Sequence, residues 1–569
     1  MELTHEQVGS EQLGHLGLLG SVIRELGLIE KIDKRLELPT NKGVIVSHGQ
    51  RVGAMILNGL GFMNSRLYMT THYFKDKPVA QLLGSGINSS HLNDDCLGRC
   101  LDAIAKYGVT KLYSEIAFEV AQEKNVLGQR MHLDSTSFSL TGRYDVDEQE
   151  DAPHPTYGHS KDHRPDLKQV MLSLTQGGAA NLPLWMEAQD GNTSDRASFQ
   201  ETVRRVKTFM DGLHNAPADV CFVVDAAFYT PKKLAELDGV KWITRVPATL
   251  KEAKQLLNAS SSSVVWDSID DNYQMTSKNT CVLGVSQRWV MLASKQAYKR
   301  ELATFERRLT KGFDTLNKAL WHLSNQTYGC SDDAEKVLKP LLKKHNYYHV
   351  DYLVKPMFKH VGRGRPAANS DKHIVGYQIH YHIASDLEKI IQKKEVLGRF
   401  LLATNQLNSS LLSDADVLTQ YKEQSTVESG FKFIKDNAFE LSSFYLKTPA
   451  RIGALMMVMT LCLMVYNFAQ YHLRKCLKDN DDALPNQLGK PVKNPTMKWI
   501  AELMCAIAVV SIQDGDKKHR FVTNVSHVHK RIIAYFGKSA LKIYGLPPDF
   551  QVVSVDYSNY KKLRDWCEM

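Results

Sequence analysis

The run Val220-Cys-Phe-Val-Val-Asp225 decides the fold class of this sequence. A short apolar run that ends at a charged residue is typical of a strand buried on both faces. Such strands occur mainly in α/β proteins, whose helices cover both faces of a sheet. We therefore examined whether the sequence on either side of the run follows an α/β pattern.

Strand-like and helix-like segments alternate around this run. Three strands and then a helix are expected before it, and a short helix and a final strand are expected after it. The expected ranges are Met131–Leu140, Gln169–Thr175, Leu182–Glu187, 197–212, 232–237 and Lys241–Val246. This order predicts an α/β fold with a mixed sheet.

The regions outside this pattern differ in composition and in the spacing of their apolar residues. Residues 1 to about 125 show the helical spacing of apolar residues, and residues 440–569 are expected to be helical and in places basic. Residues 265–400 interrupt the α/β pattern with short strands, a charged helix near 297–325 and a basic segment rich in tyrosine. A further strand is expected at Leu401–Thr404.

Composition sets limits on partners and compartment. The 569 residues carry 71 Lys and Arg against 62 Asp and Glu, and the net charge of +9 is compatible with a polyanionic partner without requiring one. The N-terminus shows no secretory signal, and nine scattered cysteines fit a reducing cytoplasm better than a disulfide framework. The apolar run Ile452–Phe468 barely reaches membrane-spanning length and stands alone, so we expect a buried helix and no membrane.

The stretch Tyr421-Lys-Glu-Gln-Ser-Thr-Val-Glu-Ser-Gly-Phe-Lys-Phe-Ile-Lys435 is expected to form one helix. At about 100° per residue, Tyr421, Gln424, Glu428 and Lys435 share one face, and apolar residues on the adjoining face would seat the helix on a core. A polar row along a core-seated helix indicates a binding or catalytic surface. The alternative is an ordinary solvated stripe.

Two aspartates are expected where strands meet turns, Asp134 and Asp225. A lone acid at such a place is most often a turn or helix cap. With Glu428, however, three carboxylates could meet at one edge of the sheet, where they would repel one another unless cations held them. Mg²⁺ or Mn²⁺ would suit such oxygen ligands, and two such ions about 3.5–4 Å apart can promote phosphoryl transfer.

The spacing Tyr421-x2-Gln424-x3-Glu428-x6-Lys435 resembles the Tyr-x2-Arg-x3-Glu-x6-Lys signature of DDE transposases from bacterial insertion sequences. That family has an RNase H-like core with the first Asp on the first strand, the second Asp after the fourth strand, and the Glu on a helix after a β-rich insertion. Asp134, Asp225 and Glu428 fit this order. Three other runs also resemble the family: Gly158–Asp166, Gly191–Asp195 and Gly362–Pro366.

The resemblance, which covers roughly residues 1–545, implies an RNase H-like mixed-sheet core in two parts with helical regions at both ends. The implied divisions are a helical DNA-binding and assembly region, the first part of the core, a β-rich basic insertion, the second part of the core and a helical C-terminal region. Their expected ranges are 1–125, 126–264, 265–400, 401–475 and 476–569.

The resemblance also implies the chemistry. Asp134, Asp225 and Glu428 would be the catalytic residues and would hold two Mg²⁺ or Mn²⁺ ions. Activated water would nick the end of the element, and the freed 3′-hydroxyl would attack a phosphodiester of the target. The implied partners are double-stranded DNA, as inverted-repeat ends and target, and a second copy of the chain in the DNA complex. The implied location is the bacterial cytoplasm, at the nucleoid.

Tyr421 and Lys435 would grip DNA phosphates near the scissile bond. Gln424 replaces the arginine of the signature and lacks its charge and its bidentate fork, which puts its own phosphate contact in doubt. Arg363 and Arg365 resemble a minor-groove hook, although an ordinary loop is an equal alternative.

Some members of the family form a DNA hairpin and stack a flipped base on an aromatic side chain. The candidates here are Phe228, Tyr229 and Trp242. Two other functions compete with transposition: a DNA-binding protein of the same fold that does not cut, and a structure-specific nuclease that cuts without joining strands.

Overall fold

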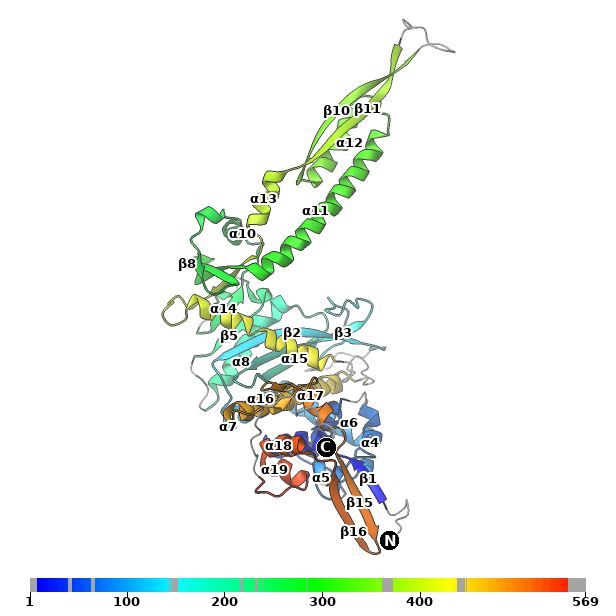
Figure 1. Cartoon of the computed structure of the whole chain (residues 1–569), viewed down its shortest axis with the longest axis vertical. Coiled ribbons are helices and arrows are strands. Elements are labelled where there is room, and N and C mark those ends of the chain that lie inside the picture. Colours follow the sequence, from blue (N-terminus) through cyan, green and yellow to red (C-terminus); the bar gives the residue numbers. More distant parts are fainter. Residues whose placement is uncertain are drawn as a thin grey trace. The chain divides into compact units, whose positions relative to one another are not determined.

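The computed structural model describes residues 8–38, 43–62, 67–142, 144, 152–214, 217, 219–230, 234–237, 239–282, 284–360, 372–436, 446 and 448–550. The chain forms two compact units, which we describe separately (Figure 1). The first unit consists of Met1–Ile243 with Thr419–Met569, and the second consists of Thr244–Leu418.

The first unit begins with the helices that the sequence predicts. They are α1 (Leu16–Glu25), α2 (Leu28–Asp33), α3 (His48–Gly59), α4 (Thr70–Tyr73), α5 (Val79–Leu83), α6 (Asp94–Tyr107) and α7 (Val109–Glu123). Capping residues fix several of their starts: the Asn93 side chain accepts a hydrogen bond from the Cys96 N–H group at the start of α6.

The mixed sheet of the first unit confirms the predicted α/β fold. Its strands are β2 (Arg130–Leu140), β3 (Lys168–Gly177), β4 (Leu182–Asp190), β5 (Cys221–Val224) and β6 (Lys241–Arg245), in the spatial order β4-β3-β2-β5-β6. β2 pairs antiparallel with β3 and parallel with β5, and β3 pairs antiparallel with β4. All residues of β5 are buried, as expected for a strand covered on both faces. The order of strands is the one that the RNase H-like resemblance implies.

Helix α8 (Asp195–Asp211) connects β4 to β5 and is held on the sheet by a charged contact. The Arg205 guanidinium donates two hydrogen bonds, of 2.9 and 2.7 Å, to the buried carboxylate of Glu187 on β4. This bidentate pair fixes the orientation of α8. It thereby also fixes Asp195, the first residue of that helix. The short helix expected at 232–237 lies partly outside the described residues.

The C-terminal part of the first unit is only partly helical. Its helices are α15 (Ser425–Ile434), α16 (Pro449–Asp479), α17 (Met497–Leu503), α18 (His527–Tyr535) and α19 (Gly537–Ile543). The strands β13 (Leu484–Pro485), β14 (Pro491–Val492), β15 (Ala508–Asp514) and β16 (Lys517–Thr523) lie between them, and β15 pairs with β1 (Val8–Gln12) as well as with β16. The expectation of a helical region is therefore wrong for β15 and β16, which are joined by a turn at Gly515 with a positive φ of 57°.

Helix α16 is buried in the first unit, as predicted for Ile452–Phe468. It packs against β4 and against α1, α3, α6, α7 and α15. It is the one helix of the described residues that is long and apolar enough to cross a membrane, and 83% of its most apolar window is buried inside the protein.

The second unit contains the expected strands and two long helices. Its elements are α10 (Lys251–Leu257), β7 (Asp267–Ser268), β8 (Tyr273–Val282), β9 (Val285–Ser294), α11 (Lys295–Ser324), α12 (Ser331–Lys344), β10 (Tyr348–His360), β11 (Lys372–Ser385), α13 (Leu387–Glu395) and β12 (Arg399–Thr404). Strands β12, β9, β8 and β7 are neighbours in that order, and β10 and β11 form a separate hairpin. The hairpin packs against α11 and α12 around a small core that includes Leu316, Leu338 and Ile379. Helix α12 was not expected from the sequence. Helix α14 (Asp414–Lys422) returns the chain to the first unit.

We predict that the buried ion pair between Asp482 and Arg531 is a sensitive point of the first unit. The two residues are 3% and 1% exposed, and Asp482 also accepts a 2.6 Å hydrogen bond from the Tyr535 hydroxyl. Asp482→Asn removes the negative charge that faces the buried Arg531 guanidinium, so chemical denaturation should show a loss of about 3–5 kcal/mol in the free energy of unfolding.

The neighbouring residue provides the control. Asp481 forms an exposed ion pair with Lys493, so Asp481→Asn should change the free energy of unfolding by no more than about 0.5 kcal/mol. The double substitution Asp482→Asn with Arg531→Met should recover part of the loss. Equal losses in the free energy of unfolding for Asp482→Asn and Asp481→Asn would contradict the prediction.

Candidate active site

Asp134 and Asp225 follow neighbouring positions on parallel strands of the mixed sheet. In the register of β2 and β5, Leu133 pairs with Val224. The next residue on each strand is an aspartate, so both carboxylates lie at the same edge of the sheet. The sequence predicted that both aspartates lie where strands meet turns. This is correct for Asp225, which directly follows β5, and wrong for Asp134, which lies inside β2 because that strand continues to Leu140.

Both carboxylates also accept a hydrogen bond from the next backbone N–H group. The Ser135 N–H group donates to Asp134 Oδ1 at 2.7 Å, and the Ala226 N–H group donates to Asp225 Oδ1 at 2.6 Å. Asp225 thereby caps the 3₁₀ turn Ala226–Phe228. The turn-cap alternative therefore holds for Asp225, and the cap fixes the direction of its carboxylate without removing it from the sheet edge.

The environment of Asp134 disfavours a negative charge. Burial raises the pKa of its carboxyl to about 6, and the nearby Asp225 and Asp195 carboxylates add to the rise. The Lys161 ammonium and the Ser135 N–H group act in the opposite direction and only partly compensate. The site therefore gathers more negative charge than its own cations neutralise.

Lys161 and Asp195 belong to this site, although the sequence interpretation assigned them no role. The Lys161 ammonium lies 3.1 Å from Asp195 Oδ2 and donates to the Ser135 carbonyl and hydroxyl at 2.7 and 2.9 Å. The Ser135 hydroxyl in turn donates to Asp195 Oδ1. Both residues lie in the runs Gly158–Asp166 and Gly191–Asp195, whose likeness to the family was the signal that could have identified them.

Glu428 lies on α15, which packs against β2 and β3 (Figure 1). Its side chain is exposed. Within the part of the chain that the structure describes, no three His, Cys, Asp or Glu side chains are close enough together to hold a metal ion. The structure therefore brings Asp134 and Asp225 together and leaves Glu428 outside a closed ligand set, and the triad remains a prediction.

The single helix expected over Tyr421–Lys435 is wrong in one respect. Helix α14 ends at Lys422 and α15 begins at Ser425, with a turn between them. In this turn the N–H groups of Gln424, Thr426 and Val427 donate to carbonyl groups three residues earlier, at 3.0–3.2 Å. The Thr426 hydroxyl also donates to the Glu423 carbonyl at 2.7 Å, which stabilises the tighter turn. The four polar residues therefore do not share one continuous helical face.

Lys435 lies at the end of α15, close to the loop that precedes β3. Its ammonium lies 2.7 Å from Asp162 Oδ1 and 5.5 Å from the centre of the Phe138 ring on β2. Lys435 is therefore next to the run that contains Lys161. This contact links α15 to the loop that also carries the cation of the Asp134 cluster.

The turn before α15 contains residues with unequal exposure. Gln424 is only 9% exposed and precedes the first residue of α15.

The neighbouring residue Glu423 makes charged contacts with β2. Its carboxylate lies 3.3 Å from the Arg130 guanidinium and 3.8 Å from the His132 ring, both at the start of that strand. Burial lowers the pKa of His132 to about 4, so this histidine is neutral at physiological pH. Nothing in the sequence indicated these contacts of Glu423. Tyr421 is partly buried.

The remaining predicted residues do not add to the site geometry. Phe228, Tyr229 and Trp242 are all at most 5% exposed, and the rings of Phe228 and Trp242 meet edge to face with their centres 6.4 Å apart. They are packed in the core of the first unit. Arg363 and Arg365 lie outside the described residues.

Comparison with known proteins assigns this geometry to a family. Residues 129–467 match the model of the transposase DDE domain, which is more than half of the chain. The chain belongs to this transposase family. Residues 8–118 match a second family model, which is described only as a domain of unknown function (DUF4277).

Comparison with individual proteins adds little to this assignment. No curated protein matches the sequence. Among solved structures, the chain is similar to the piggyBac transposase in a cryo-EM structure of its synaptic complex with hairpin DNA. The identity is 10%, the similarity covers 98% of this chain and 86% of that chain, and the TM-score is 0.38.

The donor set of this transposase domain fits a divalent cation in part. Asp134 and Asp225 supply hard oxygen ligands on adjacent strands, which Mg²⁺ and Mn²⁺ prefer. The raised pKa of Asp134 shows that its ionised form lacks a compensating positive charge, which a bound cation would provide. The pair therefore suits a cation, and any third protein ligand has to come from outside the pair.

We predict that Asp134 lowers the stability of the metal-free domain at neutral pH. Because its pKa is about 6 when folded and 3.8 in its unperturbed state, folding favours its protonated form. The stability that this preference provides is present below about pH 4 and is lost as the pH rises through about 6. Asp134→Asn should therefore raise the free energy of unfolding in EDTA by about 1–3 kcal/mol at pH 7.5, and the gain should disappear near pH 4.

Thermal melting between pH 4 and pH 7.5 would measure this difference. Asp516→Asn, in the exposed turn between β15 and β16, is the control and should show no such pH-dependent gain. Adding Mg²⁺ should stabilise the wild-type protein more than Asp134→Asn. A gain in stability for Asp134→Asn that did not vary with pH would contradict the pKa assigned to Asp134.

Proposed function

We propose that this protein is an insertion-sequence transposase of bacterial type, which cuts the ends of its DNA element and joins them to target DNA by the DDE mechanism. One observation carries the proposal: Asp134 and Asp225 lie side by side on parallel strands, inside the residues that match the transposase domain. Crowded carboxylates at the edge of a sheet have little structural value but suit metal-dependent phosphoryl transfer.

Asp134 and Asp225 would bind two divalent ions, Mg²⁺ or Mn²⁺, and Glu428 would approach them from α15 to complete the ligands. When bound, such ions activate the attacking oxygen and stabilise the leaving oxygen. The Ser135 and Ala226 N–H groups hold the two aspartates in fixed directions, so the carboxylates are preorganised for binding.

The cations at the site would orient the DNA. Lys435, 2.7 Å from Asp162, and Lys161, 3.1 Å from Asp195, are held near the sheet edge and can exchange these carboxylates for phosphate oxygens. Tyr421 would add a hydroxyl contact. Gln424 would contribute at most a neutral hydrogen bond, and its burial leaves little surface for a phosphate.

The proposed partners are the inverted-repeat ends, the target DNA and a second copy of the chain in the DNA complex. The net charge of +9 supports a polyanionic partner. Arg363 and Arg365 would contact the minor groove, and the protein would act in the cytoplasm at the nucleoid.

We predict that Asp134→Asn, Asp225→Asn and Glu428→Gln each reduce nicking of end DNA at least about 10²-fold, the loss expected when one charge-stabilising group is removed from an active site. These substitutions keep the side-chain shapes, so binding of end DNA in EDTA should change little. A gel assay of nicking with Mg²⁺ and a fluorescence anisotropy titration would measure the two quantities.

Asp516→Asn again provides a control and should leave nicking unchanged. Full nicking activity of Glu428→Gln would remove Glu428 from the mechanism while leaving the aspartate pair. A strand-transfer assay with the wild-type protein separates the competing enzyme, because a nuclease would cut the ends without joining them to target DNA.

A further inference from the structure

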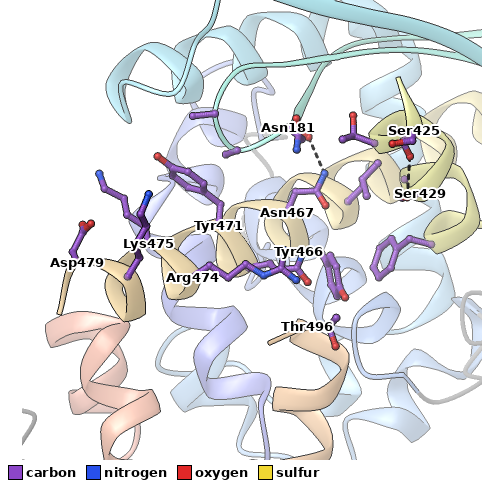
Figure 2. Close-up of a pocket in the computed structure, with 18 residues that line it drawn as sticks. Asn181, Ser425, Ser429, Tyr466, Asn467, Tyr471, Arg474, Lys475, Asp479 and Thr496 are labelled. Atoms are coloured by element: carbon purple, nitrogen blue, oxygen red, sulfur yellow. Dashed lines mark hydrogen bonds between the residues drawn. The ribbon is translucent and has the colours of Figure 1, made fainter. Parts of the chain in front are cut away.

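A pocket of about 760 Å³ lies between α15, the C-terminal half of α16 and the turn that joins β3 to β4 (Figure 2). All of its lining residues belong to the first unit. It is distinct from the carboxylate site, because its α15 residues include Ser425, Ser429 and Phe433, whereas Asp134 and Asp225 do not line it. The proposed active site therefore does not account for this pocket.

Helix α15 shows how the two sites are separated. At about 100° per residue, Ser425, Ser429 and Phe433 lie roughly 60–140° around the helix from Glu428. Val427 and Ile434 occupy the buried face on the other side. One helix thus presents one face to the core and another to the pocket, and the exposed Glu428 lies between them.

The pocket carries an excess of positive charge. Arg474, Lys475 and Lys478 line it from successive turns of α16, and Asp479 is the one carboxylate in the lining. Among the residues that the structure describes, none of these three cations forms an ion pair with a carboxylate. Unpaired cations in a concave site favour an anionic ligand.

Arg474 is the best ordered of these cations. Its Nε–H group donates to the Pro495 carbonyl at 2.9 Å, which fixes the plane of the guanidinium. Burial lowers its pKa, so its charge is poorly hydrated and would be stabilised by an anion. In Figure 2 its side chain extends along the pocket toward Tyr466, and Thr496 lies nearby. Lys475 and Lys478 also line the pocket, and their side chains are exposed, which places them at its open rim.

The same pocket offers aromatic surface. Tyr466 and Phe433 form a tilted pair with ring centres 4.2 Å apart, and Tyr471 lines the pocket beside Lys475 (Figure 2). The ring of Tyr471 is partly exposed. Cations combined with an accessible aromatic ring are the features with which proteins hold a strand of nucleic acid, through its phosphates and its bases.

We propose that this pocket binds a short stretch of a DNA strand, with backbone phosphates held by Lys475 and Lys478 and by Arg474 further along the pocket, and with one base stacked on Tyr471. This inference rests on the proposed function, which supplies the DNA. Two lysines at an open rim favour a nucleotide within a strand over a free nucleotide, because the chain must enter and leave the pocket. The bound strand would contact the helix that carries Glu428 on a face that Glu428 does not use.

The test compares two matched pairs of substitutions in the full-length protein. Lys475→Ala with Lys478→Ala removes two charges at the pocket, and Lys517→Ala with Lys518→Ala removes two exposed charges on β16, in the same unit. Affinity for end DNA with a single-stranded flank is measured by anisotropy at several NaCl concentrations in EDTA. Thermal melting confirms that each variant is folded.

We expect the pocket pair to reduce the slope of log K against log[NaCl] by about 0.7–0.9 for each phosphate that the protein no longer neutralises, and the β16 pair to leave the slope unchanged. Tyr471→Ala should weaken binding about tenfold, and Tyr471→Phe, which keeps the ring, should not. Equal slopes for the two lysine pairs, together with no effect of Tyr471→Ala, would overturn the proposal.

Titration with ATP and with inorganic phosphate, in the absence of DNA, tests the alternative source of the phosphate. Saturable binding that is lost in the lysine variant, with an unchanged DNA salt slope, would assign the pocket to a free nucleotide or phosphate and overturn the DNA assignment. The proposed function fails separately: nicking that survives Asp134→Asn would refute the catalytic assignment, whatever the pocket variants show.

Discussion

The first unit depends on the burial of α16. This helix of 31 residues is apolar on nearly all sides along its first two-thirds, and among the described residues it packs against β4 and seven helices. Burial of its Leu, Met, Ile and Val side chains is the largest single apolar contribution that one element of this unit can make, since each fully buried side chain contributes about 1.5–3 kcal/mol. The sheet therefore has a rigid support on the β4 side. On that support, the sheet can hold charged side chains such as Asp134 within its strands.

The rigidity of the paired strands is what holds Asp134 in place inside β2. Burial and two neighbouring carboxylates raise its pKa to about 6, so the folded protein holds this group against its preference for water. Lys161 only partly offsets this cost, and the parallel pairing of Leu133 with Val224 does not let the strands move apart. A flexible loop would relax by turning a carboxylate outward. In this protein the unfavourable charge is retained, which is typical of sites whose electrostatics serve a reaction.

Much of this arrangement could be predicted from the sequence, because β2, β3, β4 and β6 read as strands, β5 follows from its continuous apolar run, and α16 follows from its composition. The site was predictable in part. Asp134 and Asp225 stand directly after apolar residues of buried strands, which indicated their neighbourhood but not that β2 continues past Asp134. Lys161 and Asp195 could not be placed, because Lys161 lies in a turn, Asp195 begins α8, and their meeting depends on tertiary contacts such as those of the Ser135 hydroxyl. The turn at Glu423–Gln424 was also missed, since the apolar spacing runs through it while the backbone tightens to bonds three residues apart.

That turn has a structural consequence for α15. If α14 and α15 were one helix, the direction of Glu428 would be fixed by everything packed along both segments. Because α15 begins anew at Ser425, its orientation is set by its own contacts: Val427 and Ile434 in the core, Lys435 with Asp162, and the side chains it shares with the pocket. Each of the three faces of this short helix thus constrains the other two. A ligand on the pocket face and the loop held by Lys435 would both influence the direction of Glu428, and so whether this side chain can complete the proposed set of carboxylates.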